Sequence, residues 1–108
     1  MATRSVIATT TVVSSSQPLA VAELAHACGA DVAWVVQLVE VGIVQARIEQ
    51  QHAPPAQWRF GSSDLQRALA ARRLERDFGV GLDAAALILD LEHEVRRLKA
   101  VLASRGVD

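Results

Sequence analysis

Apolar side chains in the first half of the chain recur at intervals of three and four, which places them along one face of a helix. Residues 21–28 carry such a stripe and end at Gly29, and residues 32–41 carry a second between Asp31 and Gly42. Asp31 is a favoured N-cap residue, and glycine readily takes the left-handed conformation that closes a helix. Two short helices joined by a glycine-containing turn predict a helix-turn-helix.

The period of the apolar positions changes after the second helix. Ile43, Val44 and Ile48 on one side and Trp58 and Phe60 on the other flank a loop that contains two consecutive prolines. Short β-branched and aromatic runs on both sides of such a loop are typical of a hairpin. We therefore predict a small two-stranded wing.

A third helix is predicted after the wing. Ser62, Ser63 and Asp64 offer N-caps, and the helix would run to Phe78 and close at Gly79. Its apolar residues occupy two faces, which indicates packing against two partners.

A long last helix is predicted from residue 82 to about residue 104. Its apolar residues alternate spacings of three and four, the pattern of a coiled-coil seam. The seam consists of Ile88, Leu91, Val95, Leu98 and Leu102. It can pack back on the domain or pair with a second copy. We favour a homodimer whose contacts also include part of the globular domain, because so short a seam is weak alone.

The fold class is therefore mainly α: a winged helix-turn-helix with a small two-stranded wing and a long C-terminal helix. Residues 1–17 form an N-terminal arm, either an edge strand or flexible, and residues 18–108 form the domain. The uncharged stretch 5–22 has the length of a membrane span, but its threonines, serines and Pro18 argue against one. With a lone cysteine, Cys28, permitting no internal disulfide, we expect a cytoplasmic protein.

The charge pattern argues against a nucleic-acid-binding role. The 108 residues carry 11 basic and 12 acidic side chains, a net charge of -1, so there is no surplus of phosphate-binding groups. The second helix holds Gln37 as its only residue suited to base edges, next to Asp31 and Glu40. Arg72, Arg73 and Arg76 are interspersed with acids, as on a solvated helix face. We predict no direct DNA binding.

Signals for catalysis or metal binding are weak. His26 and Cys28 are two positions apart on a helix and so point to different faces, and His52 and His93 are far along the chain. No nucleophile elbow surrounds a serine, and Gly79-Val80-Gly81 lacks the third glycine of a nucleotide loop. We predict no catalytic residues, metal or cofactor, and a protein that is not an enzyme.

Several of these motifs together resemble the winged helix-turn-helix of the MerR-like superfamily. The resemblance covers residues 19–102. It rests on Glu23-Leu24-Ala25, Gly29, Gly42, Trp58-Arg59-Phe60, Ser63-Asp64-Leu65 and the step from Gly79 to Asp83.

Within that superfamily the chain resembles the chaperone modulatory protein CbpM family, through its length, its apolar second helix and its leucine-rich last helix. The resemblance implies a protein that binds the J domain of the DnaJ-like co-chaperone CbpA. It would inhibit the stimulation of Hsp70 (DnaK) and oppose DNA binding by the co-chaperone. The arm before Gln17 departs from the family pattern and is assigned no role.

If the resemblance holds, acidic residues of the last helix face the basic helix of the J domain: Asp83, Asp90, Glu92 and Glu94. The same acids, followed by Arg96, Arg97 and Lys99, also complement the helix dipole, which is a sufficient structural explanation. Two other functions stay open. One is a MerR-like DNA-binding transcription regulator, and the other is a dimerising scaffold with a different partner.

Overall fold

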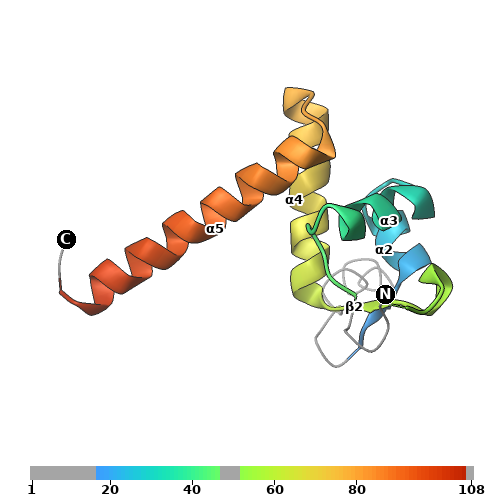
Figure 1. Ribbon diagram of the computed structural model, residues 1–108, viewed down its shortest axis with the longest axis horizontal. Coiled ribbons are helices and arrows are strands. Elements are labelled where there is room, and N and C mark those ends of the chain that lie inside the picture. Colours follow the sequence, from blue (N-terminus) through green and yellow to red (C-terminus); the bar gives the residue numbers. More distant parts are fainter. Residues whose placement is uncertain (1–16, 47–51, 107–108) are drawn as a thin grey trace, which may run out of the picture.

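The computed structural model describes residues 17–46 and 52–106 of the chain (Figure 1). The predicted arm, apart from Gln17, and Ile48 of the predicted wing lie outside the described residues. The elements are β1 (Leu19–Ala20), α2 (Val21–Ala27), α3 (Val32–Glu40), η2 (Pro55–Gln57, a 3-10 turn), β2 (Arg59–Phe60), α4 (Ser62–Phe78) and α5 (Leu82–Ser104). The fold class predicted from the sequence, mainly α with a small two-stranded sheet and a long C-terminal helix, is confirmed.

The helix-turn-helix is built from α2 and α3. The Ala20 amide donates to Oε1 of Glu23 at 2.8 Å, and the Trp34 amide donates to Oδ1 of Asp31 at 2.9 Å, so carboxylates satisfy the start of both helices. Gly29, between the helices, has a φ of 68°, a conformation that other residues adopt only with strain. The predicted cap and turn are confirmed.

The two-stranded sheet is present, but one of its strands is not the predicted one. Strand β2 pairs antiparallel with β1, with Leu19 opposite Phe60, and, within the described residues, not with Ile43 or Val44. The side chains of Ile43 and Val44 are both buried, at 1% exposure each, whereas neighbouring residues of a half-exposed strand would alternate. The Ile43 amide donates to the Leu38 carbonyl at 2.9 Å and Gly42 has a φ of 84°, so the backbone here closes the C-terminal end of α3.

Helix α4 begins at Ser62, and its N-cap is Gly61. The Gly61 amide donates to Oδ2 of Asp64 at 3.0 Å, so Asp64 acts from within the first turn. The prediction that Ser62, Ser63 or Asp64 itself is the N-cap was therefore wrong. The predicted end of α4 is confirmed, because Gly79 takes a φ of 67° just after it.

The core lies where the helix-turn-helix, β2 and the first part of α5 meet on α4. Its large fully buried side chains are Leu24, Val35, Leu38, Ile43, Val44 and Phe60. The ring of Phe60 meets that of Trp58 edge-on, with centroids 6.3 Å apart. Small residues, Ala68 and Ala71 of α4 and Ala85 of α5, let the two longest helices approach closely.

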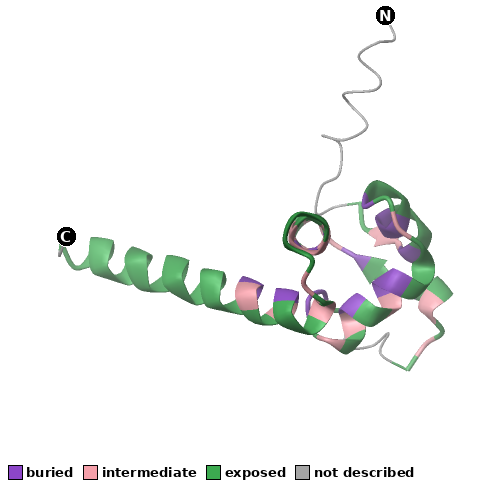
Figure 2. Cartoon of the chain, turned by 90° about the horizontal axis from the view of Figure 1, so that it is seen from above, coloured by how far each residue is buried: buried purple, intermediate pink, exposed green. Residues whose placement is uncertain are grey.

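Helix α5 leaves the domain after its first turns and extends away from it (Figure 1, Figure 2). Ala85 and Leu89 are its buried residues, and every described residue from 90 to 106 is exposed. Among the described residues, none of the helices is both long enough and apolar enough to span a membrane.

Candidate functional site

The exposed face of the helix-turn-helix is acidic and apolar. Trp34, Val35 and Leu38 turn inward from α3, whereas Val32, Ala33, Gln37 and Glu40 are exposed. No lysine or arginine occurs between residues 17 and 46, and Glu23, Asp31 and Glu40 are the acids there. An exposed helix of this composition has few groups that could bind base edges and none that could bind phosphates electrostatically.

Trp34 joins α3 to α4 through its indole N–H, which donates to Oε1 of Glu75 at 2.8 Å. The Arg72 guanidinium lies 5.8 Å from the centre of the Trp34 ring, and it donates to the Gly29 carbonyl at 3.3 Å. Arg72 also pairs with Glu75, at 3.5 Å. Trp34 is therefore a core residue with a satisfied polar atom, and Arg72 serves the interface between helices.

Arg67 links three segments of the fold. Its Nε donates to the Ile43 carbonyl at 2.6 Å, and its Nη2 lies 3.2 Å from Oδ1 of Asp90 on α5. Arg67 thus satisfies a carbonyl just beyond α3 and holds the first half of α5 against α4. Arg67 and Arg72 both have partners inside the fold, and neither belongs to a free phosphate-binding patch.

The four acidic residues proposed for partner binding lie along α5 in different settings. Asp83 is in the first turn, where a negative charge complements the helix dipole. Asp90 pairs with Arg67, and Glu94 pairs with Arg97 on its own helix. The hydrogen bond from Arg97 holds the pKa of Glu94 below its usual value and raises the pKa of Arg97. In the part of the chain that is described, Asp83 and Glu92 form no ion pair.

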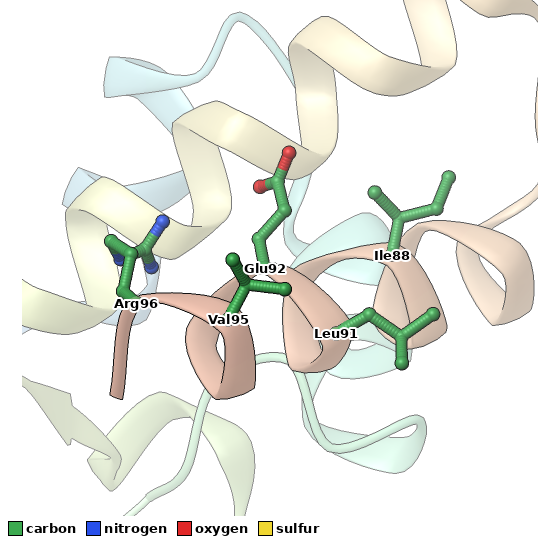
Figure 3. Close-up of a pocket in the computed structure, with 5 residues that line it drawn as sticks. All are labelled: Ile88, Leu91, Glu92, Val95 and Arg96. Atoms are coloured by element: carbon green, nitrogen blue, oxygen red, sulfur yellow. The ribbon is translucent and has the colours of Figure 1, made fainter. Parts of the chain in front are cut away.

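The predicted seam forms an exposed apolar stripe on α5, rather than packing against the rest of the described chain. The exposed fractions are 57% for Leu91, 49% for Val95, 48% for Leu98 and 47% for Leu102, and Ile88 is partly buried. A shallow hollow on this stripe is lined by Ile88, Leu91, Glu92, Val95 and Arg96 (Figure 3). The structure brings the seam residues to one side of α5 and leaves that side uncovered.

Sequence reasoning missed the two arginines that fasten the helices together and the apolar exposure beyond the seam. Leu87 and Phe78 are 60% and 71% exposed. The sequence offered one indication of the role of Arg67: it is the one arginine of α4 that lies apart from the cluster Arg72, Arg73 and Arg76.

Cys28 is buried in the core, and burial raises the pKa of its thiol, with the nearby Arg72 charge opposing that shift. The thiol therefore stays protonated at neutral pH. We expect Ellman's reagent at pH 8 to leave the folded protein unmodified and to titrate one thiol after denaturation. Immediate reaction of the folded protein would contradict this.

Among the described residues, no three His, Cys, Asp or Glu side chains cluster in a way that could hold a metal.

The arrangement of α2 and α3 on α4, with the small sheet of β1 and β2 beside them, defines a helix-turn-helix protein. A family model described as MerR HTH family regulatory protein matches residues 19–104, and the chain belongs to this family. Comparisons with curated proteins and with solved structures found no match.

Proposed function

We propose that the chain is a chaperone modulator of the CbpM type. It binds the J domain of a CbpA-like co-chaperone, lowers the stimulation of Hsp70 (DnaK), and opposes DNA binding by the co-chaperone. One observation carries the proposal: the helix-turn-helix unit, residues 17–46, has three acids and no lysine or arginine. A unit with this charge repels phosphates and attracts a basic protein surface.

The contacts of α4 support this reading. Arg67 is held by the Ile43 carbonyl and Asp90, and Arg72 is held by Gly29 and Glu75. Releasing either guanidinium toward a DNA backbone would break contacts that join the helices. The arginines of α4 that lie nearest the helix-turn-helix therefore do not compensate for the missing basic residues of α3.

The acids of α5 supply the rest of the proposed surface. Asp90 and Glu94 already have basic partners, and a carboxylate that is paired gains less from a second cation than one that meets water alone. Asp83 and Glu92 are exposed and, within the described residues, have no ion pair. They are expected to contribute more to binding a basic helix than Asp90 and Glu94.

Calorimetric titration with the purified J domain at physiological salt tests the proposal. We expect saturable binding in the micromolar range or tighter, with Asp83→Asn weakening it about fivefold and Asp90→Asn about twofold or less. Asp90→Asn is the matched control, since it removes the same charge from the same helix. Absence of heat from a folded protein would overturn the proposal.

The second candidate function, a DNA-binding transcription regulator, is favoured by the family match itself. A titration with duplex DNA at several salt concentrations distinguishes the two. A modulator with this charge pattern shows little affinity for duplex DNA at any of these salt concentrations. A DNA-binding regulator binds duplex DNA tightly at low salt, and its affinity for DNA falls steeply as salt rises. Tight, salt-sensitive DNA binding would therefore replace the modulator by the regulator.

A further inference from the structure

The guanidinium of Arg67 binds two parts of the fold that do not follow each other in the chain. Its Nε donates to the Ile43 carbonyl at 2.6 Å, and its Nη2 donates to Oδ1 of Asp90 on α5 at 3.2 Å. Nε and Nη2 lie on the same edge of this planar and rigid group. A movement of Asp90 therefore displaces the group that holds Ile43, and a movement of Ile43 displaces the group that holds Asp90.

The segment after α3 depends on side chains of α4 for its attachment. Within the described residues, positions 43–46 belong to no strand. Besides the bond from Arg67 to Ile43, the Gln45 amide donates to Oδ1 of Asp64 at 3.4 Å, one turn earlier on α4. The segment is thus bound to α4 by single side chains and not by a ladder of backbone bonds, so its position follows theirs.

Helix α5 is held near its start and extends far beyond its last contact (Figure 2). It follows the turn at Gly79, and Ala85 and Leu89 are its buried residues. Among the described residues, Asp90 is the last position of α5 whose side chain bonds to another element. The helix continues to Ser104, about 21 Å further, so a tilt of about 10° at Asp90 moves its end by about 4 Å.

We propose that Arg67 couples the position of the segment after α3 to the direction of α5. While Arg67 binds Ile43 and Asp90 together, α5 keeps the direction seen in Figure 1. When salt or a cationic group of a ligand takes Asp90 from Arg67, α5 tilts about its packed first turns and the guanidinium shifts at the Ile43 carbonyl. The link also operates in reverse, because coupling between two sites is reciprocal.

The strength of the link allows it to open. The Asp90 side chain is 70% exposed, so water and salt reach its ion pair with Arg67. Exposed ion pairs change an equilibrium by about fivefold or less, so the closed arrangement is favoured without being fixed. The inference rests on the contacts of α4 and does not depend on the J-domain proposal.

Amide hydrogen exchange of the full chain, followed by NMR, tests the link from the α5 end. Asp90→Ala removes the carboxylate that Arg67 binds. We expect the amides of Ile43 and Val44, which both donate to the Leu38 carbonyl, to exchange about threefold faster. Unchanged exchange at both amides, in a variant whose circular dichroism matches wild type, would overturn the proposal.

Glu94→Ala is the matched control for Asp90→Ala. It also removes an exposed, paired carboxylate from α5, but the partner of Glu94 is Arg97 on the same helix. Exchange at Ile43 and Val44 is expected to stay at its wild-type rate. An equal increase in both variants would show that any lost charge on α5 loosens the segment, and the specific role of Arg67 would be refuted.

The direction of α5 is measured by the distance between two spin labels. Ser63→Cys on α4 and Ala100→Cys on α5 are both exposed positions, and Cys28→Ala removes the buried thiol. Dilution with unlabelled chain leaves only distances within one chain. Asp90→Ala is expected to broaden the distribution of distances between the labels. An unchanged distribution would show that Arg67 does not set the direction of α5.

The link is tested from its other end by Gly42→Ala. Gly42 has a φ of 84° directly before Ile43, so alanine there strains the turn that positions the Ile43 carbonyl. We expect the same broadening of the label distances. Gly29→Ala is the matched control, because its φ of 68° gives similar strain at the turn between α2 and α3. Broadening by Asp90→Ala but not by a folded Gly42→Ala chain would reduce Arg67 to a clamp without coupling, and where Gly42→Ala does not fold, the exchange test decides alone.

Discussion

Replacing Phe60 by alanine is expected to lower the free energy of unfolding by about 4 kcal/mol, the largest loss expected from a single position apart from Trp34. Phe60 is 1% exposed and pairs with Leu19 across the sheet, and its ring packs edge-on against that of Trp58. Its removal leaves a cavity between the sheet and the helix-turn-helix, where neighbouring backbone is held by pairing and cannot collapse freely. Urea unfolding monitored by circular dichroism measures the change, at one fixed protein concentration.

Phe78→Ala is the matched control for Phe60→Ala. It removes the same side chain from the last residue of α4, where the ring is 71% exposed. The expected change is within about 0.5 kcal/mol, as for other surface substitutions. Equal losses at Phe60 and Phe78 would contradict the core described above and would indicate that Phe78 is buried in an assembly.

The helices could be predicted because their signals are local. Apolar spacing, the Asp31 carboxylate and the glycines that close α2 and α4 act within one or two turns, and each operates as expected. The long α5 was equally predictable, since Leu82–Ser104 matches the limits that its heptads and flanking glycines suggest.

The parts that could not be predicted depend on contacts between distant residues. The partner of β2 is Leu19–Ala20, about forty residues earlier, and nothing near Ile43 indicates that its backbone bonds return to Leu38. The alternation rule failed at Ile43 and Val44 because both side chains are buried, one after the other, in a segment whose Ile43 carbonyl accepts from Arg67. The spacing of apolar residues cannot reveal that the Arg67 side chain reaches a carbonyl 24 positions earlier in the chain.

The candidate site divides in the same way. The acidity of the helix-turn-helix is a property of composition and was visible in the sequence. The partners of Asp90 and Trp34 could be identified only from the structure. Arg67, which pairs with Asp90, and Glu75, which accepts from Trp34, both come from another helix, α4. The seam pattern was visible too, and the structure adds that Leu91 and Leu98 do not pack against the rest of the described chain. Pairing with a second copy stays a prediction.

Replacing Trp34 by alanine is expected to cost about 3–5 kcal/mol of stability, because the indole is 8% exposed and fills the space between α3 and α4. The loss goes beyond packing. Glu75 loses the indole N–H that lies 2.8 Å from its carboxylate, and Arg72 loses the ring beneath its guanidinium. Urea unfolding again gives the change, with Val32→Ala on the exposed side of the same helix expected to cost far less.

Trp34→Phe tests whether Trp34 acts in the core or in a partner interface. It keeps most of the ring volume and removes the donor to Glu75, so a loss of about 1–2 kcal/mol is expected, with the fold intact. Because Trp34 faces α4 and not the exterior, J-domain affinity of the folded variant should match wild type. A large loss of affinity with little loss of stability would place Trp34 in the partner interface and would contradict its assignment to the core.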